Sequence, residues 1–98
     1  MTPRLFLRAA AKADLREAFE WYEARSTGLG FEFLRATRAA LALIERNPSQ
    51  FAVVLDDIRR VQLLRFPYAV YYFIDDARVV VIACAHGRQH PLRWSSRR

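Results

Sequence analysis

Apolar residues in the first half of the chain recur with the period of an α-helix. One stripe at i, i+3, i+4 and i+7 consists of Leu15, Ala18, Phe19 and Tyr22. This stripe predicts an amphipathic helix over about residues 10–25. A second helix, over about residues 31–46, follows two glycines and stops before Pro48, because proline has no N–H to donate. So short a connection predicts an antiparallel helical hairpin.

Beyond Pro48 the pattern becomes that of β-strands. Residues 60–63 alternate between polar and apolar, and residues 68–74 are aromatic and β-branched. Residues 79–85 form a continuous apolar run, which is typical of a central strand covered on both faces. Residues 5–8 predict a short first strand. The order β-α-α-β-β-β predicts an α+β fold, with a helical hairpin packed on a mainly antiparallel sheet.

The predicted strand over residues 68–74 carries large side chains on both of its faces. Tyr68, Val70 and Tyr72 share one face, and Tyr71 and Phe73 lie on the other. One helical hairpin can cover only one face of a sheet. We therefore expect the second face to be exposed, with aromatic side chains beside arginines, as in a surface that binds a partner.

Length and composition place the chain among small globular proteins. Its 98 residues give room for one domain, over residues 1–98. No stretch free of charge is longer than nine residues, whereas a membrane-spanning helix needs about 20. The N-terminus has no apolar run typical of a signal peptide, and a single cysteine excludes an internal disulfide. These features predict a cytoplasmic protein that does not contact a membrane.

The positive charge lies in the C-terminal part of the chain. Residues 1–57 contain eight basic and eight acidic residues, whereas residues 58–98 contain eight arginines against two aspartates. The net charge of +6 therefore comes from the second segment. This asymmetry predicts a face that meets RNA, DNA or an acidic protein segment.

An ordered series of short segments resembles the ParE/RelE-type toxins of type II toxin–antitoxin systems. The segments cover nearly the whole chain: residues 14–22 and 28–34, Asn47-Pro48 with Phe51, Arg59-Arg60, residues 66–72 and residues 85–88. The resemblance implies the fold order already predicted from the pattern. It also implies a co-encoded antitoxin that wraps the toxin. The ParE branch is associated with poisoning DNA gyrase, and the RelE branch with cutting mRNA on the ribosome.

Two departures from the RelE pattern favour the ParE branch. The middle strand begins Phe66-Pro67-Tyr68, where the family's ribonucleases tend to have a phosphate-binding arginine, and the chain continues past Gly87-Arg88 without a catalytic tail. The resemblance then implies a gyrase-binding toxin with no catalytic residue and no cofactor. One alternative is a ribosome-dependent mRNA endonuclease, which needs a general base, a general acid and cations at the scissile phosphate. Its candidate residues are Arg60, Arg65, His86 and Arg88. A degenerate binding module without toxicity is the other alternative.

Two partner surfaces are expected. An antitoxin similar to ParD, with an acidic and partly apolar C-terminal segment, should bind across Tyr68, Tyr71 and Phe73 and form a heteromeric complex. The gyrase or ribosome target should meet the segment after the last strand, which Pro91 prevents from continuing as a strand. Its target-binding candidates are Arg88, Arg93 and Trp94. Trp94 either anchors the target or folds back onto the sheet.

The remaining reactive side chains do not predict a further site. His86 and His90 stand four residues apart, which suits a metal on a helix, but they belong to a loop that precedes Pro91. No metal site is therefore expected. Cys84 lies within the apolar strand and is expected to be inert core.

Overall fold

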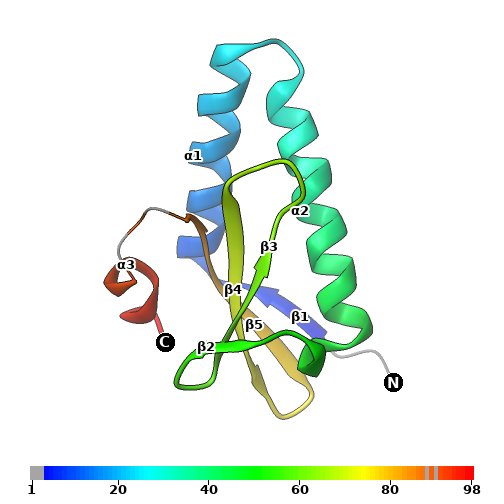
Figure 1. Cartoon of the computed structure of the whole chain (residues 1–98), viewed down its shortest axis with the longest axis vertical. Coiled ribbons are helices and arrows are strands. Elements are labelled where there is room, and N and C mark those ends of the chain that lie inside the picture. The colour runs from blue at the N-terminus through cyan, green and yellow to red at the C-terminus, as the bar shows by residue number, and fades with distance from the viewer. Residues whose placement is uncertain (1–3, 88, 90) are drawn as a thin grey trace.

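A helical hairpin covers one face of a five-stranded sheet in the computed structural model, which describes residues 4–87, 89 and 91–98 (Figure 1). The hairpin consists of α1 (Ala9–Arg25) and α2 (Leu29–Arg46). Both helices confirm the periodicity, and each begins one or two residues earlier than predicted. No helix in the described part of the chain is long and apolar enough to cross a membrane.

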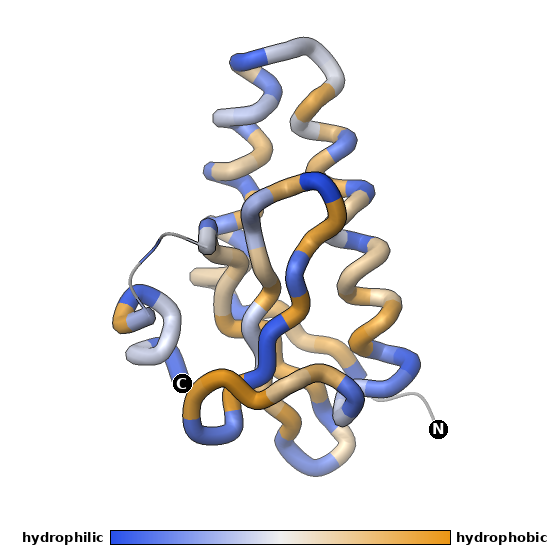
Figure 2. The backbone as a smooth tube through the Cα atoms, in the orientation of Figure 1, coloured by the Kyte–Doolittle hydropathy of each residue, from blue (hydrophilic) through white to orange (hydrophobic). Residues whose placement is uncertain are grey.

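The sheet has the strand order β1-β5-β4-β3-β2. Its strands are β1 (Arg4–Leu7), β2 (Val53–Leu55), β3 (Ile58–Gln62), β4 (Tyr68–Asp75) and β5 (Arg78–His86). β1 is parallel to β5 and all other pairs are antiparallel, so the predicted α+β fold is confirmed. The pattern missed β2, because three consecutive apolar residues show no alternation. This edge strand is half exposed despite its apolar sequence (Figure 2).

Two short helical turns complete the chain. A turn of 3-10 helix, η1 (Pro48–Gln50), follows α2, and α3 (Leu92–Ser95) begins directly after Pro91. β5 ends at His86, so the chain leaves the strand before Pro91, and the φ of −53° at Pro91 is compatible with the start of a helix. The sequence pattern did not predict this helix, because four residues are too few for a helical period to be recognised.

An aromatic cluster fills the space between the hairpin and the sheet. Phe33 of α2 stacks on Tyr22 of α1 and meets Phe66 and Tyr68 edge to face, with ring centroids 5.3–5.5 Å from Phe33. Such edge-to-face pairs contribute about 0.5–1.5 kcal/mol each beyond the area that they bury. This cluster fixes the hairpin over the end of the sheet where β4 begins.

The second face of the sheet is covered, so the predicted exposure of Tyr71 and Phe73 is wrong. Their exposed fractions are 4% and 2%. Trp94 of α3 stacks on Tyr71 with ring centroids 4.2 Å apart, and the guanidinium of Arg98 lies 3.4 Å from the centroid of the Phe73 ring. The prediction considered the helical hairpin alone, whereas the C-terminal residues supply a second layer.

Glu23 holds the turn that joins the two helices. Its carboxylate accepts hydrogen bonds from the N–H groups of Gly28 and Gly30, at 2.8 and 2.9 Å. These bonds satisfy donors that the first turn of α2 would otherwise leave unpaired. Gly28 has a φ of +92°, which glycine adopts at little cost, and Gly30 is buried against Phe19.

We expect Gly30→Ala to destabilise the fold. An added Cβ would lie 2.8 Å from the Phe19 carbonyl oxygen, and backbone cannot move aside as a flexible side chain can. Overpacking of this kind costs about 1–3 kcal/mol, which urea denaturation would measure. Gly87→Ala is the matched control, since its Cβ would meet nothing closer than 3.9 Å. Equal stability of the two variants would contradict the close approach of α1 and α2.

Candidate functional site

The sheet separates two of the residues that were candidates for RNA cleavage, Arg60 and His86. Arg60 pairs with Tyr71 across β3 and β4, so its side chain lies on the face covered by Trp94. His86 pairs with Tyr68 at the start of β4, and the two rings share the opposite face, the hairpin side of the sheet, 5.4 Å apart. Arg65 lies in the β3–β4 connection, and Arg88 lies outside the described residues. Arg60 and His86 therefore cannot surround one scissile phosphate.

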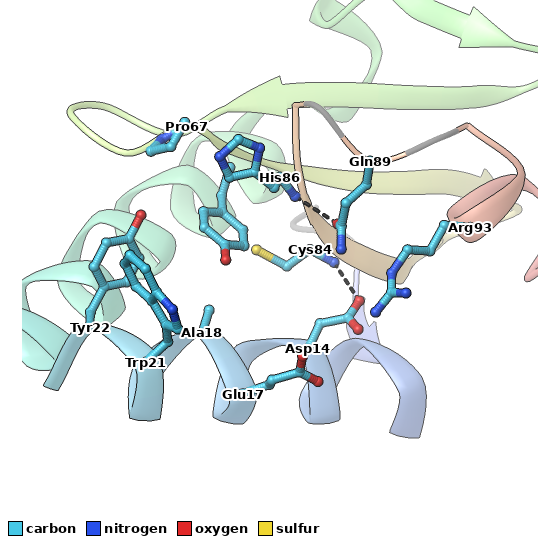
Figure 3. A pocket seen from close by; sticks show the side chains of 11 residues that line it. Asp14, Glu17, Ala18, Trp21, Tyr22, Pro67, Cys84, His86, Gln89 and Arg93 are labelled. Atoms are coloured by element: carbon cyan, nitrogen blue, oxygen red, sulfur yellow. Dashed lines mark hydrogen bonds between the residues drawn. The ribbon is translucent and has the colours of Figure 1, made fainter. Parts of the chain in front are cut away.

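A cavity of about 400 Å³ opens between α1 and the end of β5 (Figure 3). α1 forms one wall, and Cys84, His86 and Gln89 lie opposite it. The Gln89 side-chain oxygen accepts a hydrogen bond from the His86 N–H at 2.9 Å, which holds Gln89 at the end of β5. The lining residues are Asp14, Glu17, Ala18, Trp21, Tyr22, Pro67, Tyr68, Cys84, His86, Gln89 and Arg93.

The cavity has the chemistry of a binding pocket. Burial, together with the nearby charge of Asp14, raises the pKa of the Cys84 thiol to about 12. Burial also raises the pKa values of Tyr22 and Tyr68. These groups stay protonated at neutral pH, so they supply no activated nucleophile. Aromatic walls with a few polar groups at the rim suit a side chain inserted by a partner.

Tight contacts hold the C-terminal segment against the rest of the molecule. Arg97 binds the Asp14 carboxylate through two nitrogens, at 2.6 and 3.2 Å, and also donates to the Ile82 carbonyl. Arg98 binds Asp57 through two hydrogen bonds of 2.8 and 2.7 Å. These contacts join the residues after α3 to α1, to β5 and to the β2–β3 turn.

The predicted partner-binding residues are distributed over both faces of the sheet. Trp94 is 6% exposed and folds back onto the sheet, which is the second of the two alternatives considered for this residue. Arg93 is exposed and Tyr68 is partly exposed, and both line the cavity. Tyr71 and Phe73 can be reached by a partner only if the C-terminal residues move. Roles for these residues in binding remain predictions.

Sequence reasoning overlooked two acidic residues of this region. Asp14 and Glu17 lie off the apolar stripe of α1 and were not among the candidates, yet both line the cavity. The sequence did contain a signal for Asp14. It lies three residues after Ala11 and four residues before Ala18, so it shares a helix face with two alanines that are buried. In the described part of the chain no three metal-ligating side chains come together, and His90 lies outside it.

The family model described as "ParE toxin of type II toxin-antitoxin system, parDE" matches residues 5–91. The chain belongs to this toxin family. ParE toxins act within type II toxin–antitoxin systems, and an antitoxin partner follows from membership. The match covers the hairpin, the sheet and the cavity residues up to Gln89.

Two solved structures share the fold. A chain of the chromosomal ParDE system of P. aeruginosa has a TM-score of 0.75 at 14% identity, covering 87% of this chain and 96% of that chain. A double mutant of E. coli toxin RelE in the free state has a TM-score of 0.54 at 14% identity, covering 90% of this chain and 86% of that chain. At such identities these likenesses show the fold alone. No protein with a curated description matches the sequence significantly.

Trp94→Ala should lower the stability of this ParE-family toxin. The indole is buried against Tyr71, and removing such a side chain costs about 3–5 kcal/mol. A thermal melt should show the midpoint falling by more than about 10 °C. Leu92→Ala is the control from the same helix, because Leu92 is largely exposed. An unchanged melt of Trp94→Ala would show that α3 does not pack on the sheet in solution.

The Cys84 thiol should resist alkylation in the native protein. The thiolate is the reactive form, and a pKa of about 12 leaves very little of it at pH 8. Mass spectrometry after iodoacetamide treatment should show modification at least about a hundredfold slower than in denaturant. Equal rates in both conditions would contradict the buried position of this thiol.

Proposed function

We propose that this ParE-family toxin acts by binding DNA gyrase and that it catalyses no reaction of its own. The observation that carries the proposal is the separation of Arg60 and His86 by the sheet. RNA cleavage needs a base, an acid and a phosphate-binding cation around one bond. Membership of the ParE family, together with this separation, supports a toxin that acts through contacts.

The antitoxin of the pair is proposed to carry an acidic segment. The chain has a net charge of +6, and the excess of arginine lies in residues 58–98. Opposite charge on a partner accelerates its association and disfavours basic competitors. This electrostatic match supports neutralisation of the toxin by an acidic, partly apolar stretch that orders on binding.

Purified toxin should inhibit the supercoiling of relaxed plasmid by gyrase in a concentration-dependent manner. Pre-incubation with the product of the neighbouring antitoxin gene should restore supercoiling, because that product would sequester the toxin. A heat-unfolded sample of the same chain is the control for non-specific effects of a basic polypeptide. Normal supercoiling at excess folded toxin would contradict gyrase as the target.

The RelE-like alternative makes a different prediction in translating extract. The similarity of the fold to E. coli RelE gives this alternative its support. The alternative predicts codon cleavage of a translated reporter. The gyrase proposal predicts that primer extension on this reporter shows no cleavage that depends on this chain. Cleavage at codons, lost on His86→Ala, would assign the nuclease function in place of gyrase binding. Inactivity in both assays would assign the degenerate binding module.

A further inference from the structure

The edge of the sheet formed by β1 is open. β1 pairs with β5 on one side, and no other strand of the described chain pairs with it. The Arg4 N–H donates to the carbonyl of Ala77, just before β5, at 3.1 Å, and the Arg8 N–H donates to the carbonyl of Val81 in β5 at 3.0 Å. Successive residues of a strand direct their backbone groups to alternate sides. Leu5 and Leu7 therefore direct their N–H and C=O groups toward the open edge, where another strand could pair.

The two faces of β1 differ in chemistry. Phe6 lies opposite Val80, on the face of the sheet that also holds Phe73, and Arg4 and Arg8 share that face by alternation. Leu5 and Leu7 lie on the other face and pack against the hairpin-side core. A strand added at this edge would thus meet cations on one face and aliphatic side chains on the other.

Four guanidinium groups gather over two phenylalanine rings beside this edge. Those of Arg4 and Arg78 lie 5.0 and 5.3 Å from the centroid of the Phe6 ring. Those of Arg8 and Arg98 lie 5.4 and 3.4 Å from the centroid of the Phe73 ring. A guanidinium above a ring still presents N–H groups at its edge, so contact with the ring orders the cation without consuming its donors.

Arg8, Arg78 and Arg98 border an open cavity of about 560 Å³, and the charge of the four guanidinium groups is only partly balanced. Asp75 pairs with Arg78 at 2.9 Å, and Asp57 pairs with Arg98 at 2.7 Å. No carboxylate of the described chain forms an ion pair with Arg4 or Arg8, and Arg8 donates to the Arg97 carbonyl. The surface therefore retains two cations, Arg4 and Arg8, with which an incoming carboxylate could pair. They lie beside two arginine–aspartate pairs that already exist.

A polypeptide fits this surface better than a nucleic acid does. Guanidinium groups already lie over the two phenylalanine rings, so these offer no free platform on which a base could stack. The open backbone groups of Leu5 and Leu7 match the spacing of another strand, which a phosphodiester chain lacks.

We propose that the β1 edge binds an extended acidic segment in which carboxylate and aliphatic side chains alternate. The segment adds a sixth strand to the sheet, with carboxylates beside Arg4 and Arg8 and aliphatic side chains beside Leu5 and Leu7. The inference rests on the proposed function only for the identity of the partner, since the antitoxin's acidic segment is the natural occupant. It deepens that proposal by assigning the place and the side-chain pattern of the contact.

Fluorescence anisotropy with the full chain tests the proposal. The probe is a labelled seven-residue peptide in which glutamate alternates with valine, and its control has glutamine in place of glutamate. We expect saturable binding of the acidic peptide and at least tenfold weaker binding of the control. Equal affinity of the two peptides, or no binding of either, would overturn the proposal.

A charge-matched pair of variants separates this edge from general electrostatics. Arg4→Glu with Arg8→Glu should weaken acidic-peptide binding at least tenfold. Arg35→Glu with Arg38→Glu changes the net charge equally on the exposed surface of α2 and should leave binding within twofold. Equal losses in the two variants would overturn the proposal. Thermal melts check folding, and if Arg8→Glu prevents folding, Arg4→Glu against Arg35→Glu makes the same comparison.

The backbone contact has its own test. Leu5→Pro removes an N–H that points away from β5, so it leaves the pairing of β1 with β5 intact. It should weaken peptide binding several-fold more than Leu5→Ala, which removes most of the side chain but keeps the N–H. Equal binding by these two variants would overturn strand addition.

A single-stranded oligonucleotide of equal charge serves as the competing ligand. If it binds as tightly as the peptide and is equally sensitive to the Arg4 and Arg8 substitutions, the surface is a nucleic-acid site and the proposal fails. Peptide binding is measured without gyrase. A failure of supercoiling inhibition therefore bears on the proposed function alone, and a failure of the peptide experiments bears on this inference alone.

Discussion

The carboxylate of Asp14 joins three parts of the molecule that are distant in sequence. It accepts hydrogen bonds from the Cys84 N–H on β5 and from the guanidinium of Arg97, while belonging to α1 itself. Its side chain is only 13% exposed, and a carboxylate so placed is unfavourable unless its charge is paired. This acceptor therefore ties α1, β5 and the C-terminal residues together, beside the Arg98–Asp57 pair and the stacking of Trp94 on Tyr71.

The second layer changes how the net charge of the chain must be interpreted. Arg78, Arg97 and Arg98 bind aspartates within the molecule, so part of the C-terminal excess of arginine serves the fold. Arg4 and Arg8 beside β1 are among the arginines that form no ion pair within the described chain. Arginines that form no ion pair within the molecule are therefore the ones that indicate a partner surface. A count of arginines along the sequence does not distinguish them from the arginines that are paired internally.

The cavity beside α1 and the β1 edge lie on different parts of the sheet and offer different chemistry. The cavity is lined by aromatic rings and suits an inserted side chain, whereas the edge offers backbone groups and cations. An antitoxin that wraps the toxin could contact both, because a segment that orders on binding can cover a large surface. The surface of the toxin that binds gyrase would then not need to overlap with the cavity or with the β1 edge.

Local chemistry was enough to predict most of the fold. The helical period of α1 and α2, the apolar run of β5 and the breaks at Pro48 and Pro91 depend on neighbouring residues, so they could be recognised along the chain. The family resemblance likewise rests on ordered local segments. Tertiary structure alone decided which face each strand residue occupies and what covers it. The separation of Arg60 from His86 depends on strand register, and the burial of Tyr71 depends on Trp94, which is 23 residues away in sequence. Contacts between distant residues leave no periodic signal, because their geometry is set by packing rather than by spacing along the chain.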